Sequence, residues 1–148
     1  NIRSKSKAVI DAEQHEKETG INSYESWIKF AAKVKSHSKE LQKMISHNSD
    51  KILAYGASAR SSTLLNFCGI NHSQVAAIID KNPLKQGLNT PGSNIPIISF
   101  ENGLKDIENV ETILLLAWNF QDEIIRDLKA SGFTGKFIVP LPNDPQIL

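Results

Sequence analysis

Residues 52–63 decide how this chain folds, and they read Ile52-Leu53-Ala54-Tyr55-Gly56-Ala57-Ser58-Ala59-Arg60-Ser61-Ser62-Thr63. The apolar run at 52–55 predicts a strand, and the segment that follows predicts a helix over 60–68. Glycine and small residues form the turn between them, as they do where a strand passes directly into a helix. This stretch therefore predicts the first strand and the first helix of an α/β unit.

The same turn predicts an anion site. The first N–H groups of a helix have no internal acceptor, and the helix dipole adds positive charge at that end. Gly56 can take backbone angles closed to other residues, and the small residues 57–59 let a phosphate approach the backbone. Further donors are the hydroxyls of Ser58, Ser61 and Ser62 and the forked guanidinium of Arg60. We therefore expect a phosphorylated ligand at this turn.

Strand and helix patterns alternate through the rest of the chain. Further strands are predicted at 75–80, 95–98, 112–117 and 136–139, with helices at 100–105 and 119–131. Alternation of this kind predicts a parallel sheet with helices on both faces. Right-handed crossovers favour about five strands in the order 3-2-1-4-5, with Pro96 at an edge. Residues 50–148 are thus predicted to form a Rossmann-like domain of the α/β class.

Residues 1–49 are predicted to be helical, with no strand signal. Apolar side chains recur at helical spacing at Tyr24, Trp27, Ile28, Ala31, Val34, Leu41 and Ile45. Ser23 is the expected N-cap of this helix, and a weaker helix over 4–18 is expected to end at Gly20. We expect this segment to pack on the following domain or to connect it to a preceding one.

Composition limits the classes of partner. The formal net charge is +1 and 22% of residues are charged, so no global field favours nucleic acid or a membrane surface. One cysteine excludes an internal disulfide and suits a reducing cytoplasm, and four histidines show no metal-ligand spacing. No apolar run reaches the roughly 20 residues that span a bilayer. The chain begins with Asn1 and shows no signal peptide, so we expect a piece of a longer polypeptide.

The ligand site is expected at the switch point between the first and fourth strands, outside their carboxyl ends. Asp80 ends the second strand on the same edge, 24 residues after Gly56, where dinucleotide-binding folds place a ribose-binding acid. The loop that follows Asp80 could close over the ligand. The candidate binding residues are Gly56, Ala57, Ser58, Ala59, Arg60, Asp80, Lys81, Lys85, Trp118 and Asn119.

Each candidate outside the glycine turn has a structural alternative. Asp80 could cap the turn at 82–83, and Asn119 could be the N-cap of the helix at 119–131. Trp118 could cover the end of the sheet, and Lys81 and Lys85 could be solvated. Cys68, on an apolar helix end, is interpreted as a buried small hydrophobe and not as a nucleophile.

Three blocks of sequence carry a family resemblance: residues 55–70, residues 79–97 and residues 114–124. In order they read Tyr-Gly-Ala-Ser-Ala-Arg-Ser-Ser-Thr-Leu-Leu-Asn-Phe-Cys-Gly-Ile, then Ile-Asp-Lys-Asn-Pro-Leu-Lys-Gln-Gly with Thr-Pro-Gly-Ser-Asn-Ile-Pro-Ile, then Leu-Leu-Leu-Ala-Trp-Asn-Phe-Gln-Asp-Glu-Ile. Together they resemble the C-terminal domain of sugar C-methyltransferases. The helical segment, with Tyr24 and Phe30-Ala31, is similar to the stretch that precedes that domain, so the resemblance covers nearly the whole chain.

The resemblance implies a SAM-dependent methyltransferase that methylates a carbon of a nucleotide-linked deoxysugar. Such proteins combine a zinc-binding region, a central domain for S-adenosylmethionine and a C-terminal Rossmann-like domain. It implies that the last part holds the nucleotide-diphosphate sugar through Ala57, Ser58, Arg60 and Asn119. The resemblance places no catalytic residue, no metal and no S-adenosylmethionine site in this chain, whose partners are the sugar nucleotide and the remaining domains.

The turn itself also favours a diphosphate over S-adenosylmethionine. Loops that bind S-adenosylmethionine are usually richer in glycine and often follow an acidic residue, whereas here Tyr55 precedes Gly56. The positively charged sulfonium of S-adenosylmethionine would also gain nothing from the nearby Arg60 cation. Two alternatives stay open. One is an NAD-type dinucleotide module, which Asp80 suits but which lacks the second and third glycines of the usual fingerprint. The other is a non-catalytic domain in which residues 1–49 mediate oligomerisation.

Overall fold

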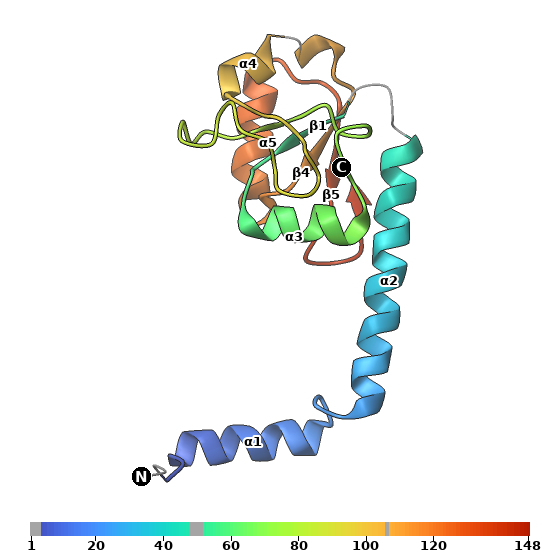
Figure 1. Ribbon diagram of the computed structural model, residues 1–148, viewed down its shortest axis with the longest axis vertical. Helices are drawn as coiled ribbons and strands as arrows, with labels where there is room; N and C mark the ends of the chain where they lie inside the picture. Colours follow the sequence, from blue (N-terminus) through green and yellow to red (C-terminus); the bar gives the residue numbers. More distant parts are fainter. Residues whose placement is uncertain (1–3, 48–51, 106) are drawn as a thin grey trace. The chain divides into compact units, whose positions relative to one another are not determined.

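The computed structural model describes residues 4–47, 52–105 and 107–148. The chain forms two compact units, Asn1–Ser36 and His37–Leu148. Figure 1 labels their helices and strands. The domain boundary expected between residues 49 and 50 lies outside the described residues.

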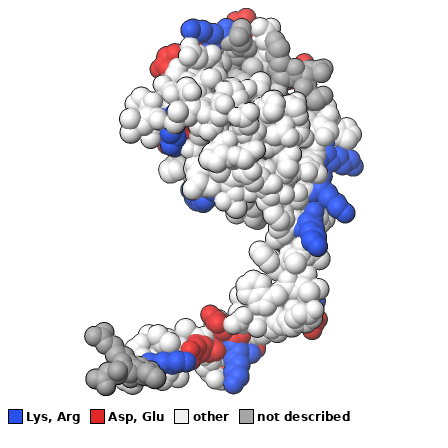
Figure 2. All heavy atoms as spheres, viewed as in Figure 1, with Lys and Arg blue, Asp and Glu red and all other residues white. Residues whose placement is uncertain are grey.

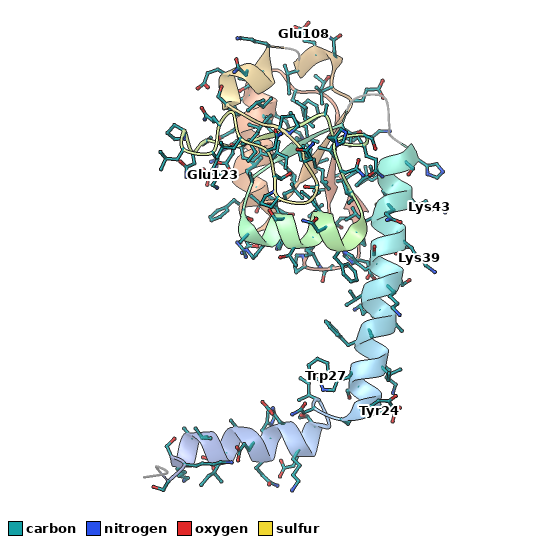
Figure 3. All side chains as sticks on the ribbon, viewed as in Figure 1. Tyr24, Trp27, Lys39, Lys43, Glu108 and Glu123 are labelled. Carbon is teal, nitrogen blue, oxygen red and sulfur yellow. The ribbon has the colours of Figure 1, made fainter. Side chains whose placement is uncertain are left out.

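The N-terminal unit contains α1 (Lys7–Thr19) and the beginning of α2 (Tyr24–His47). Gly20, with φ of 65°, ends α1 as expected from the sequence. Ser23 accepts a hydrogen bond from the amide of Ser26 at 3.2 Å, which confirms it as the expected N-terminal cap of α2. Trp27 and Phe30 stack edge to face with ring centroids 6.1 Å apart, and both remain more than half exposed. Figure 3 shows Tyr24 and Trp27 projecting from this part of α2.

The larger unit is built on one sheet of six strands. In chain order they are β1 (Ile52–Tyr55), β2 (Ala77–Ile79), β3 (Ile97–Ile98), β4 (Thr112–Leu115), β5 (Lys136–Val139) and β6 (Gln146–Ile147). The order across the sheet is β3-β2-β1-β4-β5-β6, and the first five strands are parallel. The order 3-2-1-4-5 and the position of β3 at an edge of the sheet are therefore confirmed.

The antiparallel strand β6 was missed by the sequence analysis. It pairs Ile147 with Ile138 and Gln146 with Val139. A strand of two residues is too short to show a period, and the prolines at 140 and 142 predict the end of the strand at 136–139.

Strand residues alternate between two apolar clusters, because successive side chains of a strand point to opposite faces. Ile52 packs with α3 (Ala59–Cys68) and with Leu41 and Ile45 of α2. Leu53 and Tyr55 pack with α5 (Gln121–Ala130) on the other face. The helices α3 and α5 thus cover opposite faces of the sheet, and both begin at its carboxyl edge (Figure 1).

The last predicted helix is shorter than expected. A 3-10 turn, η2 (Trp118–Phe120), precedes α5. The amide of Phe120 donates to the carbonyl of Ala117 at 2.9 Å, which tightens the chain before the α-helix begins. Asn119 therefore lies within the 3-10 turn and does not cap α5, so the capping interpretation of Asn119 is wrong.

Two short elements complete the unit: α4 (Phe100–Leu104) and the 3-10 turn η1 (Ile107–Asn109). Of the helices in the described part of the chain, none has the length and apolarity to cross a membrane. On the side seen in Figure 2, charged side chains of the larger unit lie mostly near its margin around a largely uncharged centre.

Candidate functional site

The turn between β1 and α3 lies against the end of β4. Gly56 has φ of 97°, and a Cβ on it would lie 2.6 Å from the Cβ of Ala117. Only a glycine fits both this backbone angle and this close approach. Because β1 pairs with both β2 and β4, the turn stands at the switch point of the sheet, as predicted.

The serines of the turn bond to each other. The amide of Ser61 donates to Ser58 Oγ at 3.1 Å, and the amide of Ser58 donates to Ser61 Oγ at 2.6 Å. This reciprocal cap begins α3, and Ser61 is fully buried in it. These two hydroxyls, expected as ligand donors, are thus engaged in starting the helix.

The first amides of the turn also have acceptors in the protein. Gly56 donates to the carbonyl of Ile79 at 2.8 Å, and Ala57 donates to Asp80 Oδ2 at 2.8 Å. The amides of Ala59 and Arg60 have no acceptor among the described residues. The first turn of α3 carries no acidic side chain, so these two amides and the helix dipole offer an anion a position on the surface.

Asp80 joins the turn to the loop that follows β2. Its Oδ1 accepts from the amide of Asn82 at 2.8 Å, which is the turn-capping role weighed from the sequence. Its Oδ2 accepts from Ala57 and, at 3.2 Å, from Lys85 Nζ, which also donates to the carbonyl of Ala57 at 2.5 Å. Both carboxylate oxygens and the Lys85 ammonium are therefore engaged within the protein.

Arg60 and Trp118 are brought together at the carboxyl edge. The Arg60 guanidinium lies 5.4 Å from the centroid of the Trp118 ring, within the range of a cation–π contact. Trp118 is half-buried and packs against both apolar clusters, so it covers the end of the sheet. Asn119 follows it and is exposed. The indole therefore holds the one cation of the first turn of α3 near the switch point.

A cavity of about 370 Å³ opens beside the turn, on the α5 face of the sheet. Its lining residues are Tyr55, Gly56, Asp80, Lys81, Ala117, Phe120, Glu123 and Ile124. Gly56, Asp80 and Lys81 were predicted site residues. Tyr55, Phe120 and Glu123 were not, although Tyr55 ends β1 and the other two lie in the turn and helix that follow β4, at the edge where ligands of parallel sheets bind.

Charged groups flank this cavity. Lys81 Nζ donates to Asp127 Oδ2 at 3.1 Å, and this bond raises the pKa of the ammonium, with smaller contributions that include Glu123. Burial raises the pKa of the Tyr55 phenol, against the opposing effect of Lys81. At neutral pH the cavity therefore presents a neutral phenol and a charged ammonium.

A second hollow, of about 330 Å³, includes the predicted site residues Trp118 and Asn119 in its lining. A third, of about 520 Å³, lies within the N-terminal unit, lined by Ile21, Trp27 and Phe30 among others. In the described part of the chain no group of three or more His, Cys, Asp and Glu side chains could hold a metal ion.

Comparison with known proteins gives a family and a curated relative. The model of the C-methyltransferase C-terminal domain matches residues 1–142. C-methyltransferase NovU of Streptomyces niveus is 33% identical over 147 residues, which are 95% of this chain and 34% of that protein. The chain thus spans about a third of the length of the curated relative it matches.

Two solved structures also match part of the chain, both with TM-scores below 0.5. UDP-D-quinovosamine 4-dehydrogenase from Vibrio fischeri has a TM-score of 0.46 and 24% identity, over 64% of this chain and 80% of that one. RSP, a Rex-family repressor, has a TM-score of 0.39 and 14% identity, over 90% of this chain and 65% of that one. By the match of its family model, this chain belongs to the C-methyltransferase C-terminal domain family.

Proposed function

We propose that this chain holds the diphosphate of a nucleotide-linked sugar for a sugar C-methyltransferase, while another domain holds the methyl donor. Family membership implies S-adenosylmethionine as that donor. The chain itself binds and orients the substrate and contributes no reacting group. Binding energy from the remote diphosphate then positions the sugar carbon, and such positioning can supply several kcal/mol toward the barrier.

The observation that carries the proposal is the first turn of α3. The amides of Ala59 and Arg60 are unpaired among the described residues, no acid lies in that turn, and the Arg60 guanidinium stands over Trp118 nearby. Two free N–H groups, the positive end of a helix and a forked cation together match a phosphate. Ala57 and Ser58, whose amides have protein acceptors, shape the turn and leave the phosphate to the next two residues.

The methyl donor does not fit this turn. Its sulfonium carries a positive charge, and the Arg60 guanidinium would repel it or at best contribute nothing. The carboxylate of Asp80, which could oppose a cation, is already bonded to Ala57, Asn82 and Lys85. No step of the methyl transfer is therefore assigned to residues of this chain.

An NAD-type module is the competing proposal. It depends on Asp80 accepting two ribose hydroxyls. Both Asp80 oxygens already accept hydrogen bonds and its side chain is only 11% exposed, so a ribose would have to displace the Lys85 contact. A direct titration with NAD separates the two proposals.

The test is calorimetric titration of the chain with thymidine, uridine and guanosine diphosphates, beside NAD and S-adenosylmethionine. We expect a nucleoside diphosphate to bind, and Arg60→Ala to weaken it by about 1–3 kcal/mol through loss of a charge-assisted hydrogen bond. The matched control is Arg126→Ala, which removes the same charge from an exposed position of α5 that does not line the cavity.

Equal losses in the two arginine variants would mean that Arg60 acts only through net charge. Binding of NAD alone would move the function to redox chemistry, and binding of none of the five compounds would contradict a substrate-holding role for this chain.

A further inference from the structure

The backbone of Ala57 is held on both sides by the same pair of side chains. Its N–H donates to Asp80 Oδ2 at 2.8 Å, and its carbonyl accepts from Lys85 Nζ at 2.5 Å. Lys85 Nζ also lies 3.2 Å from Asp80 Oδ2, so the ion pair and the two hydrogen bonds close a ring around this residue. Because the N–H and the carbonyl belong to successive planar peptide groups, the ring fixes the orientation of both.

The loop that carries Lys85 is ordered by bonds of its own. The amide of Lys85 donates to the carbonyl of Asn82 at 3.1 Å, and the amide of Leu84 donates to Asn82 Oδ1 at 3.0 Å. The amide of Asn82 in turn donates to Asp80 Oδ1 at 2.8 Å. Asp80 thus begins the turn that delivers its own partner, which lowers the entropy lost in holding a long side chain in one place.

These bonds decide which backbone groups remain for a ligand. Asp80 takes the amide of Ala57, and the helix cap takes the amide of Ser58. The unpaired amides of the turn are therefore those of residues 59 and 60. Only Ser58 separates them from Ala57, so the orientation of the Ala57 carbonyl limits where they point.

The pair supplies orientation to the turn and little net charge. Asp80 and Lys85 carry opposite charges 3.2 Å apart, so their fields largely cancel at a neighbouring anion. A Lys85 ammonium that turned to a phosphate would leave the Asp80 carboxylate, whose side chain is 11% exposed, without its ionic partner. Breaking a pair of this kind is costly, which favours a lysine that stays on the turn.

We propose that Asp80 and Lys85 are positioning residues for the diphosphate and that neither touches it. They hold the backbone of Ala57, and the two unpaired amides that follow face the ligand as a result. This inference rests on the proposed function, because it needs a diphosphate at the first turn of α3. It gives both residues a role other than the ligand contact expected from the sequence.

The test compares Asp80→Asn, Lys85→Met and the double variant by calorimetric titration with inorganic pyrophosphate and with uridine, thymidine and guanosine diphosphates. Each single variant should weaken binding about three- to tenfold, because either one releases the Ala57 backbone. The double variant should bind no more than about twofold less tightly than the weaker single variant, since both residues act through the same backbone. Lys85→Arg, which keeps a cation with several donors, should recover most of the affinity.

The sign of the Asp80→Asn effect separates positioning from charge. If Lys85 bound the phosphate directly, or if the pair acted only through its field, Asp80→Asn would remove a negative charge and tighten binding while Lys85→Met weakened it. Opposite signs in the two single variants would therefore overturn the positioning role. The matched control is Lys129→Met, which removes the same charge from an exposed position of α5 and should leave affinity unchanged.

Hydrogen exchange measured by NMR tests the same contact without a ligand. The Ala57 amide should exchange about tenfold faster in Asp80→Asn, which takes away its charged acceptor, and should also exchange faster in Lys85→Met. The amide of Ile78, bonded to the carbonyl of Pro96 at 2.8 Å, should keep its rate in both variants. Equal acceleration at Ile78 would mean that the variants loosen the whole unit, and it would overturn the positioning role.

The two proposals fail in different ways. Unchanged affinity in both single variants, with a diphosphate bound by the unmodified chain, would overturn the positioning role and leave the diphosphate site intact. Failure of pyrophosphate and of all three nucleoside diphosphates to bind the unmodified chain would overturn the proposed function and the positioning role together.

Discussion

The helices α3 and α5 both begin at the carboxyl edge of the sheet, yet their first turns are built in opposite ways. Helix α3 has a reciprocal serine cap, no acidic side chain in its first turn, and an arginine at its second position. Helix α5 has no side-chain cap and carries Asp122 and Glu123 in its first turn. The two helices are equally long, so their dipoles are similar. The positive end of the α3 dipole remains open to an anion, whereas Asp122 and Glu123 neutralise that of α5. Placement at a ligand-binding edge does not by itself make a helix an anion site.

The difference also makes the charge at the carboxyl edge of the sheet unequal between the α3 side and the α5 side. An elongated ligand with one charged and one uncharged portion meets a cationic turn at one helix and a partly acidic cavity at the other. Arg60, held over Trp118, marks the first, and Glu123 marks the second. Variants that change one helix and not the other therefore test the comparison directly.

The largest expected effect comes from closing the gap between the α3 turn and β4. In Gly56→Ala the new methyl group would lie 2.6 Å from the Ala117 Cβ at a φ of 97°. We expect a loss of about 2–5 kcal/mol in the free energy of unfolding, combining backbone strain with overpacking. The measurement is chemical denaturation followed by circular dichroism.

Gly132→Ala is its matched control. Gly132 has a similar φ of 95°, but nothing lies within 4 Å of the position of its Cβ. It should lose only the strain component, about 1 kcal/mol. Losses of similar size in both variants would mean that the close approach to Ala117 is unimportant.

The next effect concerns the N-termini of α3 and α5, of which only α3 has a side-chain cap. Ser58→Ala removes the cap of α3 and should cost about 1 kcal/mol, in the usual range for such a substitution. Asn119→Ala should stay within about 0.5 kcal/mol, because Asn119 is exposed and makes no cap to α5. Thermal unfolding of the two variants side by side measures both. A larger loss for Asn119→Ala than for Ser58→Ala would contradict the described cap geometry.

The smallest effect on stability should accompany a clear effect on binding. Ala59→Glu gives α3 the acidic first turn that α5 already has, and Ala59 is exposed. Helix-dipole compensation should stabilise the fold by about 0.3–1 kcal/mol. Diphosphate binding should weaken, since the new carboxylate lies beside the free amides. Ala59→Gln is the neutral control, and it should change neither the stability of the fold nor the affinity for diphosphate by much. Tighter diphosphate binding in Ala59→Glu would place the anion elsewhere.

Most of the sheet was predictable because its strands are short apolar runs bounded by glycine, proline and polar residues. The strand order follows from the alternation of strands and helices and from crossover handedness. The antiparallel β6 was not predictable, since its two residues have no period and depend on pairing with β5. The limits of α5 were misplaced because a 3-10 turn at 118–120 has the same helical composition as the helix after it.

The candidate site was predictable in position more than in contacts. The glycine turn, Asp80 and Trp118 all lie at the expected edge. The sequence could not show that Asp80 is bonded to the Ala57 amide and to Lys85, because those contacts join residues 23 and 5 positions apart through the fold. Tyr55 and Glu123 were not predicted as site residues for a similar reason. Only the pairing of β1 with β4 brings the end of β1 beside α5, the helix that follows β4.

The single cysteine has a practical consequence for watching this molecule move. Cys68 is 1% exposed within the apolar cluster on the α3 face, and burial raises the pKa of its thiol, with Ser38 opposing. A thiol reagent reacts with the exposed thiolate, so labelling must wait until the α3 face opens. Because the chain has one cysteine, all labelling reports on this position. The labelling half-time, measured across a denaturant series, gives the rate at which α3 separates from the sheet. The same measurement with diphosphate present shows whether a bound ligand slows that opening.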